Sequence, residues 1–256
     1  MNKFGLSMVI FTMLLTIPLL ANKDDYQVLD IEDENTKQVN VEKQDDIKAN
    51  EFVSDLLADV DTEIHNPFLI KQLNETAINP SPFAIGYRGK IFLGRWPLSY
   101  QSSKASWNWK YQKVNEIDHT NMGDHAPQSI LYQQEEEKHV YGALADKVDH
   151  ADQIKQMIWQ QAQEKEDLPL TFHAVVGQHT QIRDAYQLSE NQSGSLTAFV
   201  PAKKETGETT YADVYIQLKG ANKELIVKDV TTQSVSAWLP VANHITLTYE
   251  SDSGDD

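Results

Sequence analysis

Cysteine is absent from this 256-residue chain. Without thiols the protein can form no disulfide, no thiolate metal site and no cysteine nucleophile. The local motifs of phosphate-binding loops, zinc peptidases and serine hydrolases are missing as well. The sequence therefore indicates no cofactor, and a catalytic site would have to be assembled by the fold from distant residues.

Positive charge is also scarce, with 22 Lys and Arg against 38 Asp and Glu and a net charge of −16. Most of this net negative charge lies toward the two ends, since residues 22–63 hold −10 and residues 250–256 hold −4. With +1 from Lys3, −3 is left for residues 65–249. Acidic blocks repel one another and stay solvated. We therefore expect a disordered spacer over 22–50 and an acidic tail over 250–256. Acidic ends without a basic stripe argue against a nucleic-acid partner.

Long apolar runs are lacking except at the start, where Lys3 precedes an unbroken run over 4–21. This order is typical of a secretory leader. Eighteen residues of helix span roughly 27 Å, so residues 1–21 are either a cleaved signal peptide or an uncleaved membrane anchor. Both alternatives predict a protein that is secreted or anchored to the outer face of the cytoplasmic membrane, with membrane contact only through this segment. Export without disulfides favours a Gram-positive envelope.

Residues 51–249 are predicted to form a single α+β domain, with a mostly antiparallel sheet, one main amphipathic helix and short N-terminal helices. Apolar residues recur at helical spacing over 52–64 and 151–166, and Asn66-Pro67 is a helix start signal for a short helix through Leu73. Strands are expected over 90–96, 107–111, 139–145, 170–176, 196–200, 211–218, 224–230 and 244–249.

Four aromatic residues are candidates for a binding platform: Trp96, Trp107, Trp109 and Tyr111. The last three alternate with polar residues and would share one strand face. An exposed row of rings can stack on sugars or other flat partners, which would suit a glycan of the envelope. The same row facing inward would be core, and full burial of Trp107 and Trp109 would exclude the platform.

Asp118, His119, Asp124 and His125 are the candidate metal ligands, because imidazole and carboxylate together can hold zinc or another divalent ion. They lie in the polar stretch 118–128, which Gly123 and Pro127 mark as a loop. An ordinary polar loop is the alternative. His173 lies on the polar face of a predicted strand and is expected to be a surface histidine with its hydrogen bonds satisfied.

The segment 86–103, with its sequence GYRGKIFLGRWPLSYQSS, and the segment 107–115, WNWKYQKVN, resemble the YfkD-like family. These are exported proteins of bacilli and their relatives without a characterised function. The resemblance implies the host type and export, and it transfers no catalytic or binding residue.

Together these features predict an exported cell-envelope protein that acts as a non-enzymatic binding or structural module. The alternative is a secreted hydrolase with a carboxylate and histidine site assembled by the fold. If the protein is a hydrolase, we expect carboxylates and histidines to converge in a cleft. If it is a binding module, we expect an exposed apolar surface with scattered polar groups.

Overall fold

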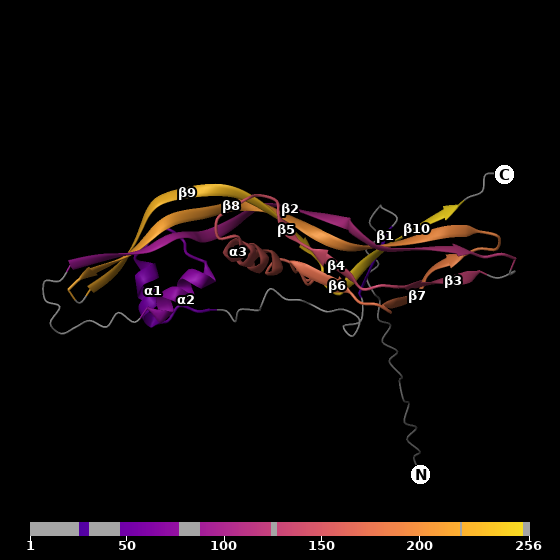
Figure 1. Ribbon diagram of the computed structural model, residues 1–256, viewed down its shortest axis with the longest axis horizontal. Coiled ribbons are helices and arrows are strands. Elements are labelled where there is room, and N and C mark those ends of the chain that lie inside the picture. Colours follow the sequence, from indigo (N-terminus) through magenta and orange to yellow (C-terminus); the bar gives the residue numbers. More distant parts are fainter. Residues whose placement is uncertain (1–25, 31–46, 77–87, 124–126, 221, 253–256) are drawn as a thin grey trace, which may run out of the picture.

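Very long strands dominate the structure, a computed structural model that describes residues 26–30, 47–76, 88–123, 127–220 and 222–252 (Figure 1). The three helices are α1 (Glu51–Ala58), α2 (Pro67–Glu75) and α3 (Ala151–Gln163). The strands are β1 (Tyr26–Asp30), β2 (Arg88–Thr120), β3 (Gln128–Gln133), β4 (Lys138–Tyr141), β5 (Ala143–Leu144), β6 (His173–Val176), β7 (Gln181–Leu188), β8 (Ser193–Lys219), β9 (Asn222–Pro240) and β10 (His244–Asp252).

Strand β8 is the centre of the main sheet. Antiparallel β2 pairs with it along its whole length on one side. On the other side β9 pairs with its C-terminal part and β10 with its N-terminal part. Strand β1 lies beyond β10, and β5 lies beyond β9. The result is an elongated, curved sheet that runs from one end of the molecule to the other (Figure 1).

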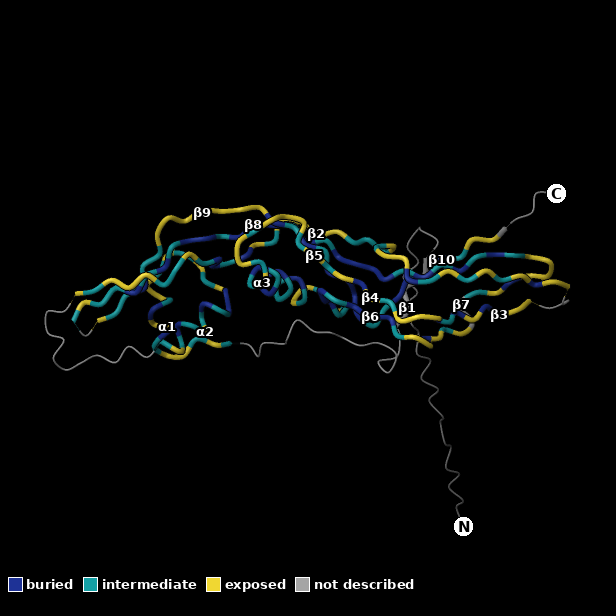
Figure 2. Tube along the Cα trace, in the orientation of Figure 1, coloured by how far each residue is buried: buried dark blue, intermediate teal, exposed yellow. Residues whose placement is uncertain are grey.

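One face of this sheet is covered by the remaining elements. Helices α1 and α2 lie near one end, α3 lies in the middle, and the two-stranded antiparallel sheets β4–β6 and β3–β7 lie toward the other end (Figure 1). Each cover encloses its own core cluster, and Figure 2 shows the buried residues concentrated on β8 and beneath these covers. Removing this apolar surface from water is the main stabilising contribution.

The predicted fold class is confirmed: a mostly antiparallel sheet with one longer helix and two short N-terminal helices. The predicted start of α2 is also confirmed, since Asn66 caps it and Pro67 is its first residue. Helix α1 ends at Ala58, earlier than expected, and α3 ends at Gln163. Within the described residues, none of these helices is long and apolar enough to cross a membrane. The predicted leader lies outside the described ranges.

The prediction of many short strands was wrong for β2 and β8, which continue through the stretches expected to be turns. Pro97 lies inside β2, where it is buried beside a register shift between Pro97 and Ser99. Proline is tolerated there because the ladder is interrupted. The stretch expected to be a disordered spacer contains β1, which pairs with β10 through Tyr26–Asp30.

Candidate functional site

A cleft of about 510 Å³ lies where the N-terminal helices approach α3. Its walls come from the segment before α1, from the start of α2, from β2 and from α3. Six of the eleven wall residues are apolar or aromatic and five are polar or charged. Such a mixture can hold a small ligand that carries polar groups. The lining residues are Ile47, Lys48, Ile64, His65, Pro67, Ile70, Tyr100, Met157, Gln160, Gln161 and Glu164.

Asn66 holds the walls of the cleft in place. Its side-chain amide donates to the Pro97 carbonyl at 2.6 Å and to Gln153 Oε1 of α3 at 2.8 Å. Its Oδ1 accepts the backbone N–H of Phe68 at 3.0 Å, which caps α2. Asn66 is fully buried, so all of these bonds form in a low-dielectric interior where leaving them unmade would be costly. One buried amide therefore ties α2 to both β2 and α3.

Tyr100 joins the cleft to the buried interior of the sheet. The residue lines the cleft, yet it is only 4% exposed and packs in the core cluster beneath α3. Burial raises the pKa of its hydroxyl well above the usual range, the charge of Glu205 raises it further, and the Ser102 hydroxyl opposes them. The phenol therefore stays protonated, as a hydrogen-bond donor, at any physiological pH.

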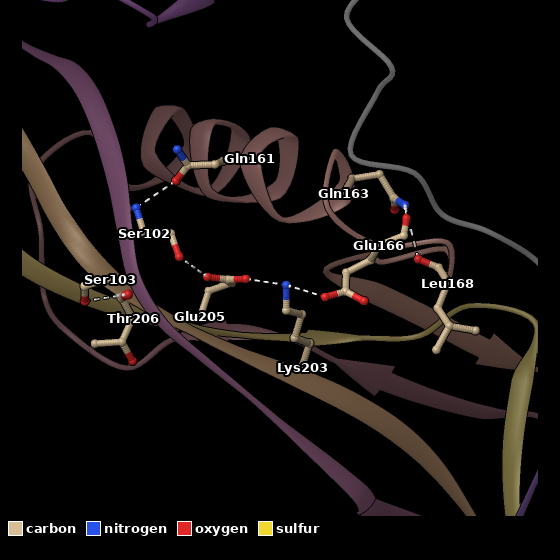
Figure 3. Close-up of polar contacts among 9 residues, drawn as sticks. All are labelled: Ser102, Ser103, Gln161, Gln163, Glu166, Leu168, Lys203, Glu205 and Thr206. Atoms are coloured by element: carbon tan, nitrogen blue, oxygen red, sulfur yellow. Dashed lines mark hydrogen bonds and ion pairs between the residues drawn. The ribbon is translucent and has the colours of Figure 1, made fainter. Parts of the chain in front are cut away.

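Behind Tyr100 runs a buried polar array, drawn in Figure 3. Ser102 Oγ donates to Glu205 Oε2 at 2.7 Å, and Lys203 Nζ lies 2.5 Å from Glu205 Oε1 and 3.0 Å from Glu166 Oε1. Gln161 of α3 accepts the Ser102 backbone N–H at 2.8 Å. The array therefore connects β2, β8, α3 and the loop after α3.

Lys203 is the charge that makes this array possible. Its side chain is 2% exposed and that of Glu205 is 1% exposed. Burial lowers the pKa of Lys203, but hydrogen bonds to Glu205 and Glu166 outweigh burial and leave the pKa raised. The ammonium is thus held charged between two carboxylates, an arrangement suited to fixing α3 on the sheet.

Sequence reasoning missed these residues because it ended one strand at Val200 and began the next at Tyr211. Within β8 the buried positions change from even numbers up to Ala202 to odd numbers from Lys203 to Tyr211, and they return to even numbers at Ala212. The first change coincides with a register shift in β2 between Asn108 and Gln112. Opposite charges two residues apart on one strand, as at 203 and 205, were the available signal.

The four predicted platform residues do not form one row. Trp96, Trp107 and Tyr111 are each partly buried against a different core cluster. Trp107 and Trp109 stack with their centroids 4.9 Å apart and their planes 8° apart. The rings of Tyr111 and Trp238 contact each other with centroids 5.1 Å apart. Trp238 was not among the predicted platform residues. Neither Trp107 nor Trp109 is fully buried, so the platform stays a prediction that rests on this stacked pair.

Asp118 and His119 lie at the end of β2 and not in a loop, opposite Ser195 and Gly194 of β8. Successive strand residues point to opposite faces, so the two side chains diverge. Asp124 and His125 lie outside the described residues. In the part of the chain that is described, no group of three or more His, Asp or Glu side chains is arranged to hold a metal ion. The four-residue metal site remains a prediction.

His173 is paired with a second histidine across the β4–β6 ladder. Its Nε2 lies 2.8 Å from Nδ1 of His139, whose Nε2 lies 3.0 Å from Glu137 Oε1. The Tyr141 ring stacks on His173 at 4.3 Å. Burial lowers the pKa of His173, and the neighbouring His139 lowers it further. His173 is therefore a half-buried histidine whose ring is hydrogen-bonded.

Comparison with known proteins agrees with the resemblance seen in the sequence. The chain is 38% identical to the "Uncharacterized protein YfkD" of Bacillus subtilis (strain 168) over 226 residues, which cover 88% of this chain and 86% of that protein. No solved structure is significantly similar to the present chain. The family described as "YfkD-like protein" matches residues 25–254. The protein therefore belongs to the YfkD-like family.

Proposed function

We propose that this protein is an exported, non-enzymatic binding protein of the cell envelope, and that the cleft between α2 and α3 is its ligand site. The cleft carries the proposal. It has a volume suited to a small ligand, and its walls combine apolar side chains with polar ones that include the amides of Gln160 and Gln161. The anchoring of its walls by Asn66 favours a preformed site, because less ordering is then required on binding.

The described residues of the cleft favour binding over hydrolysis. A hydrolase would bring two carboxylates, or a histidine and a carboxylate, into contact at the open site. His65 and Glu164 supply an imidazole and a carboxylate to the described lining, and no hydrogen bond or ion pair joins them. Glu205 and Glu166 do converge, but on Lys203 in the buried array, where their charge is neutralised. The fold-assembled hydrolase remains the alternative.

Filling the cleft tests the proposal. Peptidoglycan fragments released by a muramidase serve as the probe, because an envelope glycan is the expected class of partner. A ligand present at about a hundred times its Kd adds about 2.7 kcal/mol of stability. For a protein of this size that raises Tm by roughly 5–10 °C. We expect this shift for the wild-type protein and its loss in Ile70→Trp, because the indole would occupy the cleft.

Lys71→Trp is the matched control, since it places the same ring on the exposed side of the same helix. It should keep the shift. Loss of the shift in Trp109→Ala with full retention in Ile70→Trp would move the binding site to the stacked pair Trp107 and Trp109. Turnover of the fragments by the purified protein, detected by mass spectrometry, would support the hydrolase instead.

Export is the second part of the proposal and rests on the apolar run over 4–21 behind Lys3. Cell fractionation combined with mass spectrometry of the N-terminus tests it. We expect a chain that begins at Asn22 in the extracellular fraction, or one with an intact Met1 in the membrane fraction. A full-length chain that is soluble in the cytoplasm would contradict export.

A further inference from the structure

The end of the main sheet beyond α1 and α2 has an outer face unlike the rest of the molecule. This tip consists of residues 88–95 of β2, 213–220 of β8 and 222–230 of β9. Phe92, Tyr215 and Ile226 lie directly opposite one another across its three strands. The neighbouring positions Val214, Ile216 and Leu225 are buried in the core under α1 and α2, so the Phe92 row faces away from the helices.

Large apolar side chains of the tip are exposed to solvent. Phe92 is 56% exposed, Val230 is 50% exposed and Ile91 is 43% exposed. Phe92 packs against Tyr215 with ring centroids 4.8 Å apart. Figure 1 shows the three strands continuing beyond the helices at this end, so the apolar row projects from the body of the molecule.

The tip is basic although the protein is strongly acidic. Its three strand segments carry six basic and three acidic side chains, a net +3, whereas the chain as a whole carries −16. Lys219 pairs with Glu224, and Arg95 pairs with Asp213. Among the described residues, Lys90 and Lys228 form no such ion pair, so their charges are available to an external anion.

Lys90 lies over an aromatic ring and near enough to Lys228 for the two charges to interact. Lys90 Nζ lies 3.8 Å from the centroid of the Tyr215 ring. The pKa of Lys90 is lowered, first by loss of hydration and then by the charge of Lys228, with Asp229 opposing. Two ammonium groups that repel each other would both gain from a shared anionic partner.

A bulge in β9 exposes a second apolar side chain at the tip, that of Val230. Asp229 adopts a left-handed conformation with φ 51°, where the β8–β9 register shifts. Arg95 donates to the Asp229 carbonyl at 3.2 Å and to Thr231 Oγ1 at 2.6 Å. The bulge held in this way leaves Val230 exposed two residues after Lys228.

We propose that the tip docks onto an anionic membrane surface, with Lys90 and Lys228 at the lipid headgroups and Phe92 and Val230 in the interfacial layer. Basic residues beside exposed aromatic and aliphatic side chains are the combination that binds an anionic bilayer. A soluble polyanion would use the lysines but would leave the apolar side chains in water. The acidic remainder of the chain would be repelled by the same surface, which orients the molecule with its tip toward the lipid.

A fluorescent label at the tip tests this docking on the full chain. Because the chain has no cysteine, Asn222→Cys creates a unique site for an environment-sensitive dye. Ser189→Cys is the control site, placed before the opposite end of β8, which is up to roughly 85 Å long as an extended strand. The probes are vesicles of equal parts phosphatidylglycerol and phosphatidylcholine, and vesicles of phosphatidylcholine alone. Comparing the two vesicle compositions removes any membrane binding by the apolar leader, because that binding should be the same for both.

We expect the dye at position 222 to brighten on anionic vesicles only, and the dye at position 189 to respond to neither. Each lysine near an anionic surface strengthens binding by about fivefold, so Lys90→Gln with Lys228→Gln should raise the lipid concentration for half-maximal signal about 25-fold. The control double variant Lys110→Gln with Lys147→Gln removes two exposed lysines outside the tip. It should change the lipid concentration for half-maximal signal little. Equal brightening on both vesicle compositions, or an unchanged response of the Lys90/Lys228 double variant, would overturn the proposal. Binding of soluble polyphosphate that is insensitive to Phe92→Ser, with no vesicle response, would assign the tip to a soluble polyanion instead.

Discussion

Replacing Lys203 by Met is expected to lower the free energy of unfolding by about 3–5 kcal/mol, because the change leaves the buried Glu205 carboxylate without its counter-ion. Glu205 is 1% exposed and accepts from Ser102 and contacts Lys203. Without the ammonium, water cannot replace the lost partner unless α3 moves away. Urea unfolding followed by circular dichroism measures the difference.

Lys204→Met is the matched control for this variant. Lys204 is the next residue on β8, and its Nζ lies 5.7 Å from the centroid of the Trp238 ring without a buried ion pair. Its replacement removes only this cation–π contact and should lower stability by no more than about 1 kcal/mol. A loss in Lys203→Met as small as that in Lys204→Met would show that Glu205 is hydrated and that the array does not hold α3.

The double variant Lys203→Met, Glu205→Leu separates the missing charge from the missing contact. Replacing both members of a buried ion pair by apolar residues is often neutral, whereas removing one is not. We expect the double variant to recover most of the stability that Lys203→Met loses, which makes the two substitutions strongly non-additive. This variant also keeps the experiment informative if Lys203→Met alone fails to fold.

The raised pKa of Lys203 fixes the direction of the pH dependence that this ion pair contributes. A raised folded-state pKa means that the folded protein holds this proton more tightly than the unfolded chain does. The contribution to stability is therefore complete below the unfolded value of about 10.4 and is lost as pH rises through the folded value. This pH-dependent contribution should be absent from the double variant Lys203→Met, Glu205→Leu when its stability is measured at alkaline pH.

Gly207→Ala is expected to cost about 2–3 kcal/mol, the upper part of the range for overpacking a close contact. Gly207 lies on β8 between Ser102 of β2 and Val235 of β9. A Cβ atom here would lie 2.2 Å from the Gln101 carbonyl oxygen and 2.8 Å from the Tyr100 ring. Because the nearer contact is with backbone, β2 would have to separate from β8 beside the polar array.

Glu208→Ala is the control, because Glu208 is the next residue and is exposed. It should be within about 0.5 kcal/mol of wild type in the same urea experiment. Adding Tyr100→Leu to Gly207→Ala should recover little, since the Gln101 oxygen remains in place. A Gly207→Ala protein as stable as wild type would mean that β2 can shift at this point at no cost.

Local sequence signals predicted the elements whose causes are local. Asn66-Pro67 begins α2 because an Asn side chain can satisfy a free N–H of the first turn and Pro needs none there. The apolar stripe of Ile154, Met157, Ile158 and Ala162 is buried in α3, as its helical spacing indicates. The sequence offers Asp149 or Asp152 as the cap of α3, and that prediction was wrong. His150 occupies the cap position, in a left-handed conformation without a side-chain bond.

Features that depend on distant partners were not predictable in the same way. Lys203 and Glu205 fall between the expected strands 196–200 and 211–218, and only the pairing of β8 with β2 and β9 shows that this segment continues the strand. Their burial is stable because Glu166, far away in sequence, supplies a second carboxylate to Lys203. The same holds for Trp238, which contacts Tyr111 only because β9 pairs antiparallel with β8.

The sequence by itself determined the family, the fold class, the position of the helices and the uneven distribution of charge, because each is written in composition or in patterns a few residues long. Only the tertiary structure decided that two strands run nearly the length of the molecule, that an ion pair is buried beneath α3, and that a cleft lies beside α2. It also decided which lysines gather at the basic tip. These features arise from contacts between residues far apart in the chain, whose energies depend on burial and distance and are therefore absent from any local pattern.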